Sequence, residues 1–165
     1  MVVLLIIGIL MAIAIPTYLG ERSRAEDRAA ESDLRTALTT IKALYTNYGN
    51  FKFLPLSGTV STVQAAEPAL RWSSSLSSSP SQVAVQSTGA NSAVMVSRSP
   101  SGMCFWIMDV ETDNASIIGS SFFNSETITG AGVWYATRSP GGPGGSCELG
   151  LNSPWSWSRS TGTGW

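Results

Sequence analysis

The first fifty residues divide into an apolar half and a charged half. MVVLLIIGILMAIAIPTYLG (1–20) carries no charge, whereas nine of the next fifteen residues, ERSRAEDRAAESDLR, are charged. Apolar residues then recur at intervals of three and four, which predicts an amphipathic helix over 21–49 with one apolar face. That face consists of Ala30, Leu34, Ala37, Leu38, Ile41, Leu44, Tyr45 and Tyr48. We expect the helix to end near Tyr48-Gly49-Asn50, because glycine readily adopts the left-handed conformation that ends a helix.

Residues 1–20 are predicted to form an apolar helix with an interruption. A helix from Met1 to Ile15 would span about 22 Å, and extension to Gly20 would reach about 30 Å, the thickness of the hydrocarbon core of a membrane. Gly8 is a weak helix former, and Pro16 cannot donate a hydrogen bond to the residue four positions earlier, so an interruption is expected near Gly8–Pro16. A secretory signal peptide, a plain membrane anchor and an apolar helix that packs against its own copies all fit this pattern.

The remainder of the chain predicts a sheet between two loop regions. Residues 50–81 are rich in Pro, Gly and Ser and are expected to form a loop that connects the helix to the sheet. A short helix could form within it, around Val63–Leu70. Four segments rich in β-branched and aromatic residues follow, at 82–86, 92–97, 103–109 and 132–137, and predict an antiparallel sheet over 82–138. Residues 139–165 are expected to form a Gly/Ser/Trp-rich loop. The predicted fold class is α+β, with the long N-terminal helix packed on an antiparallel β-meander.

Composition narrows the chemistry of this 165-residue chain. A formal net charge of −1 provides no basic field for nucleic acid, and the absence of histidine removes the commonest general base and metal ligand. No nucleophile–base pair is visible, so we expect neither an enzyme nor a cofactor. Beyond residue 42 the chain is weakly charged and rich in hydroxyl groups, which is typical of exported proteins. Cys104 and Cys147 are then expected to form a disulfide worth about 4 kcal/mol, the alternative being two buried thiols.

Two weaker motifs lie after the third β segment. DVETDN (109–114) places Asp109, Glu111 and Asp113 at alternate positions, from which their oxygens could bind Ca²⁺. The motif lacks the glycine and the distal glutamate of an EF-hand loop, so an acidic hairpin turn is the simpler interpretation, and no metal is expected. Asn114-Ala115-Ser116 fits an N-glycosylation acceptor.

The N-terminal third resembles the type IV pilin family and its relatives, the type II secretion pseudopilins. The resemblance is carried by VVLLIIGILMAIAIPTYLG and by RSRAEDRAAESDLRTALTTIKALY, and covers Met1 to about Tyr48. Beyond residue 50 it is only architectural: a meander and one late disulfide. Family members are cut by a prepilin peptidase just before an N-methylated aromatic residue, which a glutamate follows. Aligned on GILMAIAIP, that glutamate would fall two residues before Met1, so Met1 is expected to be an internal methionine.

The resemblance implies a structural subunit, most similar to a major type IV pilin, of an extracellular filament that serves adhesion, motility or DNA uptake. The apolar helix would lie in the inner membrane before assembly and then pack against further copies of the chain in the filament. Implied partners are those copies, the lipid bilayer, the pilus assembly machinery and the prepilin peptidase. The filament-core residues would be Val3, Leu4, Ile6, Ile7, Leu10, Met11, Ile13 and Ile15.

Further expectations follow from the same resemblance. In pilus filaments the stretch between the corresponding glycine and proline is commonly unwound, and the same is expected from Gly8 to Ile15, a simple kink at Pro16 being the alternative. Within the family, the alternative function is the major pseudopilin of a type II secretion system or a competence pilus. From a different class, the chain could be a single-pass membrane-anchored extracytoplasmic binding domain.

Overall fold

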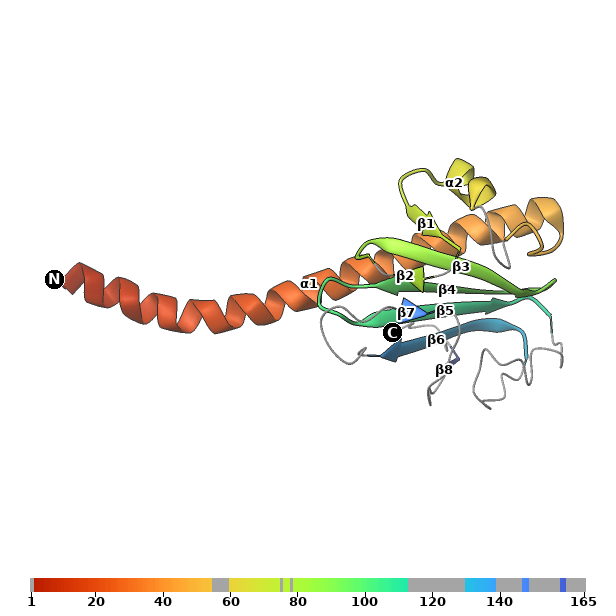
Figure 1. The fold of residues 1–165 in the computed structure, drawn as a ribbon. Coiled ribbons are helices and arrows are strands. Elements are labelled where there is room, and N and C mark those ends of the chain that lie inside the picture. Colours follow the sequence, from red (N-terminus) through yellow and green to blue (C-terminus); the bar gives the residue numbers. More distant parts are fainter. Residues whose placement is uncertain are drawn as a thin grey trace.

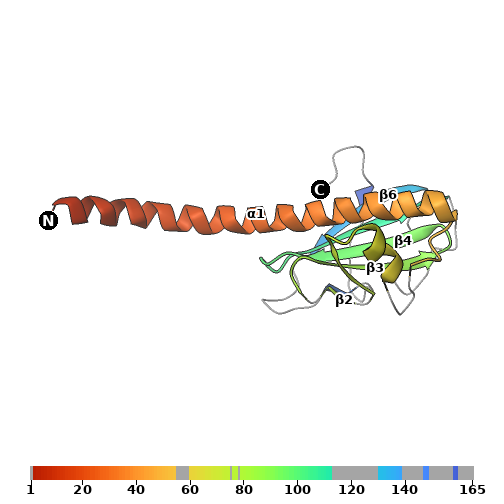
Figure 2. The ribbon, with the colours of Figure 1, turned by 90° about the horizontal axis from the view of Figure 1, so that it is seen from above.

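The chain folds into one long helix and a twisted β-sheet. The computed structural model describes residues 2–54, 60–74, 76–77, 79–112, 130–138, 147–148 and 158–159. The C-terminal half of helix α1 (Val2–Tyr48) packs along one face of the sheet, and its N-terminal half extends beyond the sheet (Figures 1 and 2). A short helix, α2 (Ser61–Ala66), lies near one edge of the sheet. The expected α+β architecture is confirmed.

Four consecutive strands form the predicted antiparallel meander: β3 (Gln82–Gly89), β4 (Ser92–Arg98), β5 (Cys104–Val110) and β6 (Gly132–Arg138). Two short strands extend it. β1 (Arg71–Ser73) pairs in parallel with β3 at one edge, and β8 (Ser158–Arg159) pairs antiparallel with β6 at the other. A separate pair joins β2 (Leu76–Ser77) to β7 (Cys147–Glu148).

The prediction of loops over 50–81 and 139–165 is therefore wrong in part, because these ranges contain α2, β1, β2, β7 and β8. Strands of two or three residues have no periodicity of their own and form only because a partner strand lies beside them. α2 also lies earlier than the expected Val63–Leu70, ending at Ala66. Pro68 explains the shift, since the residue before a proline is disfavoured in helical conformation.

The predicted apolar face of α1 covers the sheet. Four of its residues are buried against side chains of β3, β4 and β5, namely Ala30, Leu34, Ala37 and Ile41. Leu38, Leu44 and Tyr45 are partly buried at the margins of the same core. Tyr48 is the exception, since it is 55% exposed and contacts the ring of Phe53 instead. The helix ends as predicted: Gly49 has φ +70° and donates its N–H to the Tyr45 carbonyl at 2.7 Å.

A second apolar cluster lies on the other face of the sheet and contains the disulfide. Cys104 of β5 is bonded to Cys147 of β7, with their Cα atoms 5.7 Å apart, so the expected disulfide is confirmed. Trp106 and Met108 of β5 are buried in the same cluster. The disulfide therefore ties the C-terminal part of the chain to the centre of the sheet.

The interruption predicted near Gly8–Pro16 is not found in the single chain, because α1 is helical throughout this stretch. A proline removes one backbone donor and weakens the adjacent hydrogen bond of the helix. The Thr17 hydroxyl donates to the Ile13 carbonyl at 2.9 Å, which adds a hydrogen bond to the helical turn that contains the proline. Unwinding of Gly8–Ile15 within a filament stays a prediction.

Candidate functional site

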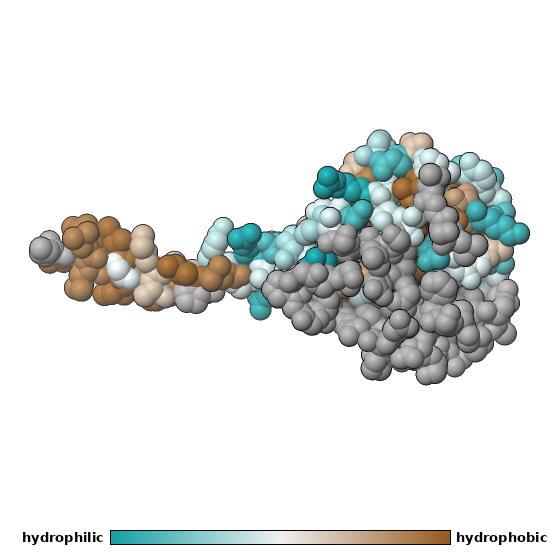
Figure 3. Space-filling view, viewed as in Figure 1, coloured by the Kyte–Doolittle hydropathy of each residue, from teal (hydrophilic) through white to brown (hydrophobic). Residues whose placement is uncertain are grey.

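The most conspicuous functional feature is the projecting part of α1, residues 2–19, which we call the apolar segment. Thirteen large apolar or aromatic side chains of this segment are 43–69% exposed. They are Val2, Val3, Leu4, Leu5, Ile6, Ile7, Ile9, Leu10, Met11, Ile13, Ile15, Tyr18 and Leu19. Figure 3 shows this segment as a brown rod that extends beyond the domain. A monomeric soluble protein rarely exposes a continuous apolar surface of this kind, so the segment requires an apolar environment.

The length of the apolar segment fits a lipid bilayer. Eighteen residues of α-helix span about 27 Å, close to the ~30 Å of a hydrocarbon core. α1 contains a stretch long and apolar enough to cross a membrane, and none of that stretch is buried in the rest of the chain. By length and composition, the helix is thus suited to span a membrane.

The eight residues predicted to form a filament core all lie on the apolar segment and are all exposed. They do not gather on one side, since large apolar residues follow one another along almost the whole segment. A helix that is apolar all round suits an environment that surrounds it, such as lipid or a bundle of helices. It is not built to lie with one face on a sheet, as the C-terminal half of α1 does.

A charged collar follows the apolar segment. Arg22 pairs with Glu26 at 2.9 Å, and Arg24 pairs with Glu21 at 3.0 Å, as their spacing predicted. Both arginines are largely exposed to solvent, so each pair contributes only a few tenths of a kcal/mol. The collar therefore contributes little to stability, but it marks the point along α1 at which apolar side chains give way to charged ones.

Asp27 fixes the angle at which α1 reaches the domain. Its Oδ1 accepts hydrogen bonds from the hydroxyl groups of Ser99 at 2.6 Å and Ser101 at 2.5 Å, both in the turn between β4 and β5. Gly102, with φ +96°, completes this turn. Asp27 lies one turn before Ala30, the first buried residue of the helix, so these bonds hold the helix where its free part begins.

Asp27→Ala is expected to lower the free energy of unfolding by about 1–2 kcal/mol, because two hydrogen bonds to a half-buried carboxylate are lost. Urea unfolding of the full chain in detergent micelles measures this loss. Glu26→Ala is the matched control and should cost less than about 0.5 kcal/mol, since it removes a neighbouring carboxylate whose salt bridge among the described residues is with exposed Arg22. Equal losses from the two variants would contradict an anchoring role of Asp27.

The chain matches no protein-family model, no curated protein and no solved structure. Its architecture is compatible with that of a type IV pilin, because it combines a long N-terminal apolar helix, a β-sheet and one disulfide.

The residues of the calcium hypothesis have another role in this structure. Asp109 lies on the helix-facing side of β5, fully buried, with an oxygen 3.0 Å from Lys42 Nζ. Glu111 accepts a hydrogen bond from the same Nζ at 2.9 Å. No group of three side chains able to hold a metal occurs among the described residues. Asp113 and the glycosylation candidate Asn114 lie outside the described residues.

Burial affects the pKa values of Asp109 and Lys42 unequally. Burial raises the pKa of Asp109 from 3.8 to about 6, and the Lys42 ammonium offsets only part of this effect. Burial alone would lower the pKa of Lys42, but the hydrogen bonds and charges of Glu111 and Asp109 together raise it above 10.5. The lysine keeps 41% of its side chain exposed, whereas Asp109 has lost its contact with water. The carboxylate therefore bears most of the cost of burying the pair.

Sequence reasoning missed Asp27 and Lys42 as contacts between the helix and the sheet. For Lys42 a signal existed: Phe105, Ile107 and Asp109 alternate on one face of a buried strand, so the aspartate needed a cation there. Lys42 follows Ile41 at the margin of the apolar face and is the cation that the helix provides. Asp27 had no comparable signal, because its partners are serines of a turn.

Proposed function

We propose that this chain is the major subunit of a type IV pilus, a non-enzymatic structural protein that polymerises through α1 into an extracellular filament. The observation that carries the proposal is the apolar segment, which is long enough to span a membrane and exposed on all sides. It continues into the folded domain as one unbroken helix. The resemblance of VVLLIIGILMAIAIPTYLG to pilin N-termini supports the same function.

The apolar segment would occupy two environments in turn. Before assembly it lies in the inner membrane as a single-pass anchor, and during assembly it leaves lipid to pack against the same segment of neighbouring copies. Apolar surface stays hidden from water in both states, so the transfer changes the hydrophobic free energy little and an assembly motor can drive it. By resemblance, that motor belongs to the pilus assembly machinery, and a prepilin peptidase would act upstream.

The shape of the subunit favours an open filament over a closed oligomer. The domain lies at one end of α1 and is much wider than the helix (Figures 1 and 2). Staggering neighbouring copies along the axis lets the apolar segments pack closely while it gives each of the wider domains its own height. A staggered, heterologous contact does not close on itself and continues as a helical array. Domains then cover the outside and apolar segments form the centre.

Two other functions use the same segment. A major pseudopilin of a type II secretion system or a competence pilus would assemble by the same contacts into a different filament. A single-pass anchored binding domain would keep the apolar segment in lipid permanently. The length of the apolar segment fits an anchored domain as well as it fits a pilin. Whether the chain leaves the membrane distinguishes these two functions.

Negative-stain microscopy of material sheared from cells that produce the chain tests the proposal. Filaments decorated by an antibody against the folded domain are expected, and cells without the gene should lack them. Recovery of the whole chain in the membrane fraction, with no decorated filaments in the sheared material, would reject assembly and leave the anchored domain. Decorated filaments that appear only when a secretion system is overproduced would favour the pseudopilin.

A further inference from the structure

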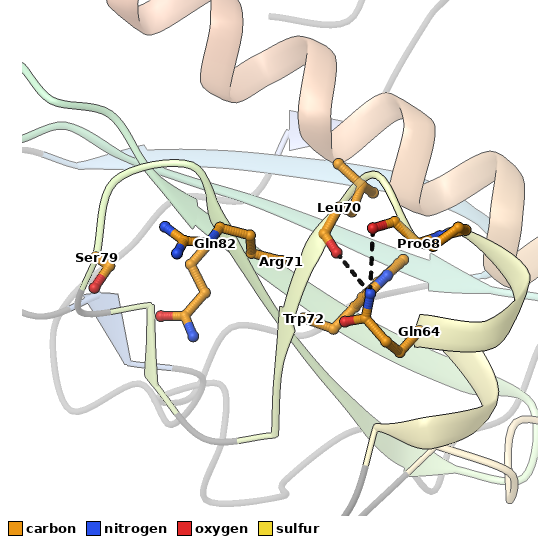
Figure 4. A pocket seen from close by; sticks show the side chains of 7 residues that line it. All are labelled: Gln64, Pro68, Leu70, Arg71, Trp72, Ser79 and Gln82. Carbon is orange, nitrogen blue, oxygen red and sulfur yellow. Dashed lines mark hydrogen bonds between the residues drawn. The ribbon is translucent and has the colours of Figure 1, made fainter.

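A polar pocket lies at the edge of the sheet farthest from β8. It has a volume of about 400 Å³ and is enclosed by the end of α2, strand β1 and the turn that leads into β3 (Figure 4). Polar atoms make up most of its lining. The residues with polar side-chain atoms that line it are Gln64, Arg71, Trp72, Ser79 and Gln82. None of them belongs to the apolar segment, so the pocket would remain with the folded domain when α1 is in lipid or in a bundle.

Arg71 gives the pocket its positive charge. It is an exposed residue, and in the parallel register of β1 and β3 it lies directly beside Gln82. Figure 4 shows the side chains of Arg71 and Gln82 extending together toward Ser79. Within the described part of the chain, no carboxylate pairs with Arg71. Glu67, the acid nearest in sequence, instead accepts a hydrogen bond from the Ala69 N–H.

The wall opposite Arg71 is held in place by hydrogen bonds. The Gln64 amide donates to the Leu70 carbonyl at 3.2 Å, and the Trp72 indole N–H donates to the Glu67 carbonyl at 2.9 Å. On the other side, Ser81 has φ 60°, which is uncommon for a residue other than glycine and brings Ser79 and Gln82 to the pocket. A site that is already formed loses little entropy on binding a ligand.

We propose that this pocket binds a sugar acid, a hydroxylated ring that carries one carboxylate. A guanidinium binds a carboxylate through two parallel hydrogen bonds, which gives Arg71 the role of orienting the acid group. The side-chain amide of Gln82 and the Ser79 hydroxyl supply donors and acceptors suited to ring hydroxyls, and Gln64, whose amide nitrogen donates to the Leu70 carbonyl, supplies its Oε1 as an acceptor. Because little of the pocket surface is apolar, a hydrophobic ligand is disfavoured. An acidic polysaccharide is then a surface to which the domain adheres, independently of whether the chain assembles into filaments.

The test is a titration of the full chain in detergent micelles with D-glucuronate, D-glucose and inorganic phosphate, followed by backbone amide chemical shifts. Glucuronate is expected to shift the amides of residues 70–73 and 79–82 with a millimolar Kd, and glucose to bind at least tenfold more weakly. Phosphate distinguishes a sugar acid from a general anion: it should bind more weakly than glucuronate, because it makes no ring contacts.

Arg71→Gln should weaken glucuronate binding at least tenfold. Arg24→Gln, which removes an exposed arginine from the collar, should leave binding unchanged, and an intact disulfide with unchanged shifts elsewhere verifies the fold of both variants. Absence of binding, equal binding of glucose, phosphate binding as tight as that of glucuronate, or an effect of Arg24→Gln equal to that of Arg71→Gln would each overturn the proposal. None of these outcomes bears on filament formation.

Discussion

A lysine in place of Ile6 or Leu10 is expected to abolish filaments while leaving the C-terminal domain folded. In the filament, the ammonium would be buried among apolar segments without a partner, and each of many copies would carry the same charge. In the membrane, a lysine at the centre of a single helix costs about 3 kcal/mol, so insertion should also weaken. Filament yield in sheared material, measured by negative stain and immunoblot, is expected to fall below detection.

The domain should be insensitive to these changes because the apolar segment makes no part of its core. Ile6 is 51% and Leu10 61% exposed, and the first buried residue of α1 is Ala30. The variants should therefore keep the Cys104–Cys147 disulfide and the near-UV circular dichroism of the wild type. Ile6→Leu tests whether any change at this position is harmful, and Ser23→Lys adds the same charge in the exposed collar; both should assemble. Normal filament yield from Ile6→Lys and Leu10→Lys would sink the proposed apolar core.

The sequence predicted those helices and strands in which apolar residues recur with a clear period. The apolar face of α1, its end at Gly49 and the four strands of the meander all appear in the structure, because spacing and turn residues determine them locally. The disulfide between Cys104 and Cys147 was predicted from the even number of cysteines and from a composition typical of exported proteins. Strands β1, β2, β7 and β8 could not be predicted, since they exist only through pairing with strands distant in sequence.

The apolar segment was predicted almost completely, whereas the polar contacts between the rest of α1 and the sheet were not. Hydropathy identifies a segment that needs an apolar environment without any knowledge of the fold. The Asp27 anchor depends on a turn more than seventy positions away, and the ion pair of Lys42 depends on the register between helix and sheet. Pro16 was misjudged for the single chain, because a proline removes only one hydrogen bond of a helix, and the remaining turns of α1 continue on both sides of it.

Lys42→Met is expected to lower the free energy of unfolding by about 1–2 kcal/mol at neutral pH, because Asp109, with a pKa already near 6, becomes protonated at pH 7 once the further penalty reaches about 1.4 kcal/mol. The variant keeps the length of the side chain but leaves the carboxylate of Asp109 buried without its cation, which is the costly way to break a buried pair. Neither oxygen of Asp109 accepts a well-aligned hydrogen bond from the described residues that would replace this contact. Lys52→Met, at an exposed position just beyond α1, is the matched control and should change stability by less than about 0.5 kcal/mol.

The pH dependence identifies Asp109 as the group responsible. Because burial raises the pKa of Asp109 from 3.8 to about 6, the folded protein holds this proton more tightly than the unfolded chain does. The stability contributed by Asp109 is therefore greatest below pH 4, falls as the pH rises to about 6 and is constant above that, a loss of about 3 kcal/mol. Asp109→Asn lacks the titrating group, so its stability relative to the wild type should rise by that amount between pH 4 and pH 7.

Combining the variants separates the buried charge from other effects of the lysine. Without Lys42 the pKa of Asp109 should rise further, so the defect of Lys42→Met should be largest at pH 7 and smaller at pH 4, where the carboxyl is neutral. In Lys42→Met/Asp109→Asn no charge remains buried, and most of the lost stability should return, because a neutral amide is far less costly to bury than a carboxylate. A defect that is equal at both pH values, or that persists in the double variant, would instead assign the role of Lys42 to its hydrogen bond with the less buried Glu111.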